Sequence, residues 1–319
     1  MKGRGAVGKP ERTLGKRTAR VAALAVLVAL TATGCSGDEI LRFGWPVGVT
    51  QQADQMRNLW TWTVVAALVV GVIVWGLIFW TATFHRKKKT ADGEPEELPR
   101  QFQYNIPLEL FTVVVPTIMV VVLFFFTATT ENNVLKKVDN PDLKVQIVAF
   151  QWNWEFKYED ANAKKADGQQ VSTVGSSGEI PLLVLPVGKT IQYDLLSTDV
   201  IHSFWVPEFH FKRDVFPSPD KNNQDSSFQN KIDREGSFVG RCAELCGTYH
   251  SVMNFEVRAL SADKFDQYIS LRKQVNPATG QTFTASEALA KMNCGELCTP
   301  HAVTTQPFNT DRTARTASN

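Results

Sequence analysis

Two long stretches without a charged residue constrain this chain more than any other feature of its sequence. The first runs over residues 59–84 and the second over residues 110–130. At ~1.5 Å per helical residue, each is long enough to cross a membrane hydrocarbon core of ~30 Å. Tryptophans lie near both ends of the first stretch, as is typical of side chains at a membrane interface (Trp60, Trp62 and Trp80). We therefore predict two transmembrane helices, at 59–84 and 107–130.

Charged residues between these stretches predict how they are oriented. A basic run, His85-Arg86-Lys87-Lys88-Lys89, follows the first stretch directly. Because positive charge is enriched on the cytoplasmic side of membrane proteins, residues 85–106 should form a cytoplasmic loop. Two crossings then leave both residues 35–58 and the chain after residue 131 outside the cell. The protein should be a multi-pass protein of a bacterial plasma membrane with an external C-terminal domain.

The N-terminus has the pattern of an export signal. Residues 1–20 carry seven Lys or Arg against one acid, an apolar run covers residues 21–30, and small residues lead to Cys35. We predict a signal peptide over 1–34. Cys35 directly after Gly34 resembles a bacterial lipoprotein cleavage site, which would make Cys35 a lipidated residue in contact with membrane lipid. An ordinary signal peptide with an incidental cysteine stays open, because Ala32 stands where Leu is usual.

After residue 131 the pattern changes to short runs of alternating and β-branched residues, punctuated by Pro and Gly. Such runs are typical of a small β-sandwich. We assign residues 131–270 to one external β domain. Residues 160–178 are polar and rich in Gly, Ser and Ala, which predicts a hairpin loop. The expected strands cover residues 144–150, 179–187, 190–196, 237–241 and 253–260.

One loop of this domain concentrates soft metal donors. Cys242, Cys246, His250 and Met253 have the spacing Cys-x3-Cys-x3-His-x2-Met, and His202 lies upstream in a strand-like setting. Thiolate, imidazole and thioether are donors that copper prefers, whereas a thioether contributes little to zinc. A disulfide between the two cysteines is the alternative for that pair taken alone. Two thiolates can bridge two metal ions, so the set favours a dinuclear copper centre.

These residues resemble the copper A segment of cytochrome c oxidase subunit 2. By position, the resemblance makes Cys242 and Cys246 bridging thiolates and His202 and His250 terminal ligands. It makes Met253 and the carbonyl of Glu244 weak ligands, with the Glu244 side chain facing a Mg ion shared with subunit 1. It also implies a membrane-anchored α + β fold, in which a two-helix transmembrane hairpin is followed along the chain by an external cupredoxin-like barrel.

The same resemblance implies a function and partners. The chain would take electrons from a cytochrome c and pass them to haem a of subunit 1, which also holds haem a3 and copper B. Subunit 3 would be a further partner, and the oxidase would reduce oxygen to water and pump protons. Whether the cytochrome c is soluble or fixed in a respiratory supercomplex stays open at this point.

Two residues outside the loop receive roles from the resemblance. Trp152, in the run Gln-Trp-Asn-Trp-Glu-Phe, would be where electrons enter, while Trp154 would pack in the core. Glu109, seven positions before Pro116, would stand at the mouth of a proton channel. From the residues alone, Trp152 is equally a core aromatic and Glu109 a solvated acid of a first helical turn. Acids at Asp199 and Asp214 would help docking or simply be hydrated.

Residues 271–319 form an extension that the family pattern does not cover. We predict a helix over 286–294, capped by Ser286, and a disulfide between Cys294 and Cys298, whose spacing echoes the copper loop. The tail over 306–319 should be disordered.

Other classes of protein fit less of the sequence. The net charge is +2 and no basic patch is typical of nucleic-acid binding. A quinol oxidase subunit 2 would lack copper ligands, all of which are present here. A membrane-anchored copper chaperone or zinc-stabilised binding module would need neither the paired tryptophans nor Glu109. A nitrous-oxide reductase would need a large catalytic domain.

Overall fold

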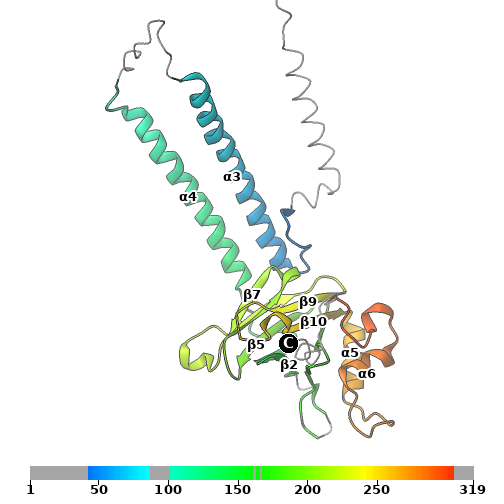
Figure 1. The fold of residues 1–319 in the computed structure, drawn as a ribbon. Helices are drawn as coiled ribbons and strands as arrows, with labels where there is room; N and C mark the ends of the chain where they lie inside the picture. The colour runs from blue at the N-terminus through cyan, green and yellow to red at the C-terminus, as the bar shows by residue number, and fades with distance from the viewer. Residues whose placement is uncertain (1–41, 87–100, 161–162, 166, 305–319) are drawn as a thin grey trace, which may run out of the picture. The chain divides into compact units, whose positions relative to one another are not determined.

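The computed structural model describes residues 42–86, 101–160, 163–165 and 167–304. Residues 1–45 and 46–319 are separate compact units, and the account below concerns the second. The predicted signal peptide, Cys35, most of the cytoplasmic loop and the C-terminal tail lie outside the described residues. Figure 1 shows two long helices followed by a β domain with two short helices at its edge.

The two long helices are α3 (Gln51–Phe84) and α4 (Ile106–Val134). Both are long and apolar enough to cross a membrane, and their apolar side chains are largely exposed. Such a surface needs lipid or another protein against it. The hydroxyl of Thr50 caps α3 by accepting from the backbone N–H of Ala53. This cap starts α3 at residue 51, eight residues before the uncharged stretch begins.

Within the described residues, ten strands form two packed five-stranded sheets. The first sheet has the order β3-β2-β1-β5-β8 and the second β4-β10-β9-β6-β7. The pairs β1·β5 and β4·β10 are parallel and the others antiparallel. Their bounds are β1 Leu143–Phe150, β2 Asn153–Tyr158, β3 Ser172–Val174, β4 Leu182–Pro186, β5 Thr190–Ser197, β6 His202–Val206, β7 Phe211–Val215, β8 Ser227–Lys231, β9 Gly236–Cys242 and β10 Asn254–Leu260.

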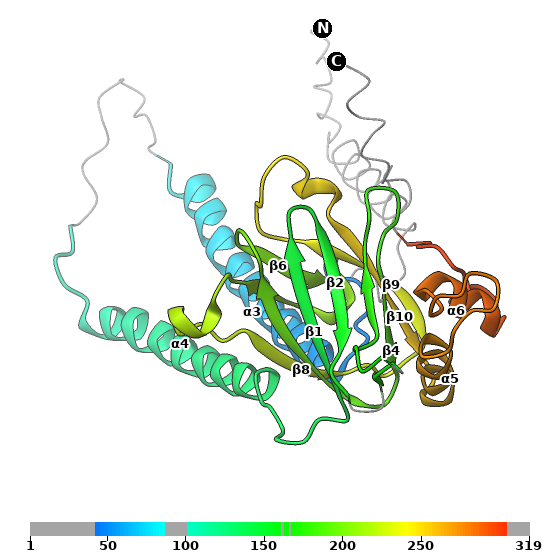
Figure 2. The ribbon, with the colours of Figure 1, turned by 90° about the horizontal axis from the view of Figure 1, so that it is seen from below.

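The core between the sheets is aromatic and continuous. Trp154, Phe204 and Phe255 are buried and pack edge to face or stacked, with ring centroids 4.7–6.0 Å apart. Figure 2 shows the sheets from below, with β1 and β2 in front. The predicted β-sandwich is confirmed. The predicted loop over 160–178 contains the short strand β3, which pairs with β2.

Residues before α3 also belong to the β domain. Val49 and Ala53 are completely buried, and Thr50 forms a bridge with Ile232. The ring of His210 contacts two carbonyl oxygens of this segment, those of Ala53 and Pro46, each at 2.9 Å. The start of α3 is therefore built into the domain.

Residues 262–298 contain more helix than the sequence indicates. Helix α5 (Ala262–Arg272) was not predicted, and it crosses the predicted domain end at residue 270. Helix α6 spans Ala285–Met292, and its cap is Thr284, not Ser286. Thr284 is the cap because its hydroxyl accepts from the Glu287 N–H while its own backbone N–H donates to the Glu287 carboxylate, which completes a capping box. A 3-10 turn, η5 (Gly295–Cys298), follows, and a disulfide joins Cys294 to Cys298.

Candidate metal centre

Strand pairing places the candidate ligands at one end of the second sheet. Cys242 ends β9 and Met253 directly precedes β10, so the loop between these neighbouring strands returns to its own starting point. The Cys242 N–H donates to the Met253 carbonyl at 3.1 Å, which closes the loop. His202 begins β6, the other neighbour of β9, and the pairing of Phe204 with Cys242 brings it alongside.

The six candidate donors form two matching sets. Cys242 Sγ lies 3.8 Å from His202 Nδ1 and 3.3 Å from the Glu244 carbonyl oxygen. Cys246 Sγ lies 3.6 Å from His250 Nδ1 and 3.8 Å from Met253 Sδ. The two sulfurs are 3.7 Å apart. Each thiol thus has one imidazole and one weak donor beside it, and the thiols lie between the two sets.

These separations fit donors gathered around metal ions. A metal bonded to sulfur at about 2.3 Å and to imidazole nitrogen at about 2.0 Å, with tetrahedral angles, holds those donors about 3.6 Å apart. The His–thiol separations are 3.6 and 3.8 Å. His202, Cys242 and Cys246 are buried, and their ligand atoms all lie within 4.8 Å of one another. The soft donor set matches copper better than a hard cation.

Asp199 orients the His202 ring. Its Oδ1 lies 2.9 Å from His202 Nε2, and it also accepts from the N–H groups of Val200 and Gln151. Burial raises the pKa of Asp199, but the His202 and backbone hydrogen bonds outweigh this and lower it. An ionised carboxylate only accepts, so Nε2 carries the proton and Nδ1 is left facing Cys242. The sequence suggested docking or hydration for Asp199 and missed this role.

The two thiols have different proton affinities. Burial raises the pKa of Cys242, but hydrogen bonds from His202 and nearby backbone groups outweigh it and lower the pKa to about 7. Burial and the neighbouring Cys242 charge raise the pKa of Cys246 to about 12. For His202, burial lowers the pKa, but Cys242 and Asp199 raise it above its ordinary value. Without a metal, the cluster holds one negative charge on sulfur more readily than two.

Two side chains contact the loop from the β1–β2 turn. Trp152 Nε1 and Gln151 Nε2 both donate to the Cys246 carbonyl, at 3.0 and 2.8 Å. Trp152 is partly exposed and meets the ring of Tyr249 edge to face, whereas Trp154 is buried and donates to the Met253 carbonyl. Gln151 was not singled out from the sequence, since an amide in a turn carries no signal of its own.

The remaining predicted residues lie elsewhere. Glu109 is in the first turn of α4, where its carboxylate accepts from the Asn105 N–H at 3.0 Å. Asp214 is on β7, half-exposed and 4.0 Å from Lys212, outside the donor sets. Cys294 and Cys298 form the separate pair already described.

The fold and the donor sets define a class: a membrane-anchored, cupredoxin-like protein with a buried candidate site for a soft metal. Residues 143–260 match the sequence model of the family described as "Cytochrome C oxidase subunit II, periplasmic domain".

Comparison with individual proteins extends this match to nearly the whole chain. The probable cytochrome c oxidase subunit 2 of Nocardia farcinica is 46% identical, over 97% of this chain and 93% of that one. The subunit 2 of Mycobacterium tuberculosis is 43% identical, over 96% and 92%. Among solved structures, the periplasmic domain of subunit II from Bradyrhizobium japonicum is 28% identical with a TM-score of 0.35, covering 42% of this chain and 95% of that chain. This chain belongs to the cytochrome c oxidase subunit 2 family and is a subunit of a haem-copper terminal oxidase.

Proposed function

We propose that this chain receives electrons for its oxidase from a cytochrome c, at a binuclear copper A centre, and passes them to haem a of subunit 1. The observation that carries the proposal is the matched arrangement of donors: one imidazole and one weak donor beside each of two adjacent thiols. A mononuclear centre would need only one thiolate.

Each donor has a defined part in this proposal. Cys242 and Cys246 would hold the metal pair as thiolates, and His202 and His250, one beside each thiol, would add the imidazole ligands. The weak ligands are Met253 and the carbonyl of Glu244. When bound, the copper pair takes up and releases one electron at a time. The hydrogen bond from His202 to Asp199 and the loop closure at Met253 hold the donors in place, so little rearrangement should accompany a change of charge.

Trp152 is the proposed point where electrons enter. Its ring is partly exposed, and its indole N–H contacts the carbonyl of the bridging residue Cys246. It therefore links the surface to the donor set through one hydrogen bond. Trp154 is completely buried and serves packing.

Other parts of the proposal concern the partner subunits. The Glu244 side chain would hold a Mg ion shared with subunit 1, which also binds haem a3 and copper B. Glu109 would lie at the entrance of a proton channel into subunit 1. Subunit 3 would complete the core of the oxidase, and the cytochrome c donor is either soluble or fixed in a respiratory supercomplex. Oxygen reduction and proton pumping would occur in subunit 1.

We further propose the domain order and topology derived from the sequence. A signal peptide over 1–34 is removed, Cys35 is lipidated, and the hairpin of α3 and α4 spans the bacterial plasma membrane. The β domain then lies on the external side with its extension over 271–319. Two apolar helices followed by a domain of a periplasmic family support this topology.

Metal analysis with copper spin resonance on the full chain in detergent, reconstituted with copper, tests the proposal. Two coppers sharing one unpaired electron, seen as a multi-line hyperfine pattern, are expected. Cys242→Ser and Cys246→Ser should each abolish that pattern, and Cys294→Ser, the matched control, should leave it. One zinc, or one copper with a simple four-line pattern, would instead make the chain a binding module.

A further inference from the structure

The C-terminal extension lies over a fully buried ion pair on β10. Glu256 and Arg258 are 2.5 Å apart, and the side chain of each is 0% exposed. Their neighbours Phe255, Val257 and Ala259 face the aromatic core, so the ion pair lies on the opposite face of the sheet. That face would meet water if residues 295–304 did not cover it.

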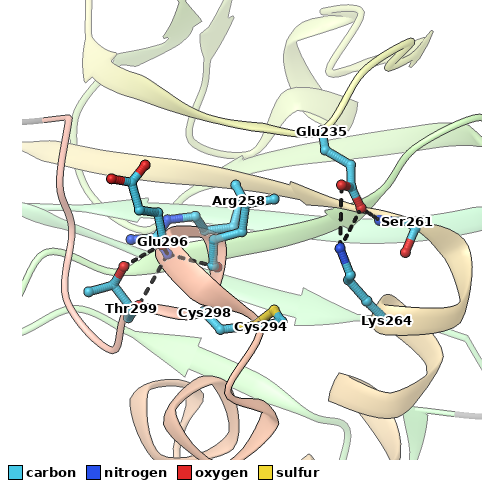
Figure 3. Close-up of a disulfide and its surroundings, with 9 residues drawn as sticks. Glu235, Arg258, Ser261, Lys264, Cys294, Glu296, Cys298 and Thr299 are labelled. Atoms are coloured by element: carbon cyan, nitrogen blue, oxygen red, sulfur yellow. Dashed lines mark hydrogen bonds and ion pairs between the residues drawn. A yellow bond between two sulfur atoms is a disulfide. The ribbon is translucent and has the colours of Figure 1, made fainter.

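The ion pair holds these residues almost entirely through their backbone. Arg258 donates to the carbonyls of Leu297, Thr299 and His301 at 2.9, 3.1 and 2.7 Å. The second carboxylate oxygen of Glu256 accepts from the N–H groups of Val303 and Thr304. Figure 3 shows Arg258 next to the turn that carries Cys294, Glu296 and Cys298. We name residues 295–304 the C-terminal strap.

The disulfide closes the turn at the start of the C-terminal strap. Cys294 is partly exposed, whereas Cys298 is buried, with 4% of its surface accessible. Arg258 hydrogen-bonds to the carbonyls on both sides of Cys298, those of Leu297 and Thr299, which holds the backbone of the turn around this residue. Thiol–disulfide exchange depends on access to the sulfur that is attacked, so an external thiolate reaches Cys294 more readily than Cys298.

From this asymmetry we infer that Cys294–Cys298 is a thiol–disulfide exchange site for an external dithiol reductant, and that its reduction releases the C-terminal strap from β10. One thiolate of the dithiol attacks Cys294 Sγ, the bond to Cys298 breaks, and Cys298 leaves as a thiolate and takes up a proton. The second thiol of the reductant then attacks the mixed disulfide and frees Cys294 as a thiol. Two electrons pass to the pair, and the reductant ends as a disulfide.

This site is distinct from the metal centre. Cys242 and Cys246 are free thiols in the structure, and they belong to the β9–β10 loop, whereas the Cys294 pair follows α6. The two pairs fall on different tryptic peptides, so mass spectrometry reports on each separately. A failure at Cys294 would leave the proposed copper centre untouched, and the reverse also holds.

The first test traps the mixed disulfide. The full chain in detergent is mixed with a thioredoxin-like dithiol protein whose resolving cysteine is replaced by Ser, and the linked peptides are mapped by mass spectrometry. Within the extension, we expect the linkage at Cys294, at least tenfold over Cys298. Linkage mainly at Cys298, or no linkage at either residue, would overturn the inference.

The second test follows release of the C-terminal strap by hydrogen exchange. The amides of Val303 and Thr304, which donate to Glu256, should exchange at least tenfold faster after reduction by the dithiol. A Cys294→Ala, Cys298→Ala double variant should show the same loss without reductant. Ser286→Ala, which removes only an exposed hydrogen bond from α6 to Glu179, is the matched control and should leave these amides protected. Unchanged protection in the reduced protein and in the double variant would show that the disulfide does not hold the C-terminal strap.

Discussion

Removing Arg258 should destabilise the β domain far more than removing an exposed basic residue from the same region. Arg258→Met leaves the Glu256 carboxylate buried without its cation, and three backbone carbonyls lose their donor. Breaking a buried ion pair by removing one partner costs about 3–5 kcal/mol. Three N–H and O–H donors still reach Glu256, so we expect the lower half of that range.

A matched control is available beside it. Lys264 pairs with Glu235 at 3.1 Å, but both side chains are 36% exposed; Figure 3 shows this pair and Arg258. Solvent screens such a pair, so Lys264→Met should cost no more than about 1 kcal/mol. Thermal unfolding of the full chain in detergent, followed by tryptophan fluorescence, measures both. At about 2–4 °C per kcal/mol, Arg258→Met should lower Tm by about 10 °C.

A double variant tests this reasoning, because the direction in which the second substitution changes stability depends on the cause of the loss. If the cost comes from an uncompensated buried charge, adding Glu256→Gln to Arg258→Met should recover part of the lost stability, because the amide is neutral and still accepts hydrogen bonds. A double variant less stable than Arg258→Met alone would refute the reasoning. So would equal losses for Arg258→Met and Lys264→Met.

Three further predictions concern the core, the helix junction and the metal centre. Gly240→Ala places a Cβ 2.1 Å from the buried Phe255 ring, so the free energy of unfolding should fall by about 1–3 kcal/mol and Tm should fall with it. An unchanged Tm would contradict this packing. Burial raises the pKa of Asp225, but hydrogen bonds from Lys137 and the Ser227 N–H, together with the nearby Arg213, outweigh it and lower the pKa. The contribution of this carboxylate to the stability of the fold is therefore present above the ordinary Asp pKa and is lost as the pH falls through the lowered one. Asp225→Asn should cost at most about 1 kcal/mol at pH 7, with a difference from the parent that shrinks below pH ~4 in unfolding titrations. Trp152→Phe should slow reduction by cytochrome c at least tenfold in stopped flow while leaving the copper spectrum unchanged; an unchanged rate would place electron entry elsewhere.

The sequence predicts best where the chemistry is local. Cys242 to Met253 supply five of the six donor positions within one loop, and an apolar stretch without charges predicts a membrane helix from its length alone. The partner of that loop, His202, was found because so few histidines exist. Its alignment beside Cys242 depends on β6 pairing with β9, which the sequence does not reveal.

Long-range pairings explain most of what was missed. Glu256 and Arg258 alternate with apolar residues, a pattern typical of a strand with one face in water, and only residues some 40 positions later cover them. Asp199 was missed for a different, local reason: it lies only three residues before His202, but the sequence does not show that the turn after β5 folds its carboxylate onto the ring. Helix α5 combines polar and apolar residues over barely three turns, which is too short for a clear periodic signal.

The burial of Val49, Thr50 and Ala53 within the β domain bears on the order in which the molecule is assembled. These residues lie just before and in the first turn of the helical hairpin, whereas their contacts His210 and Ile232 follow it. The domain is thus composed of two chain segments separated by the whole hairpin. In the proposed topology, its fold cannot be completed until α4 has been inserted and the chain after it has been translocated, so membrane insertion and external folding become one coupled process during biogenesis. A shortened soluble version that starts after α4 would lack the buried residues that the segment before and at the start of α3 contributes to the domain. Adding residues 46–53 through a linker should restore those contacts.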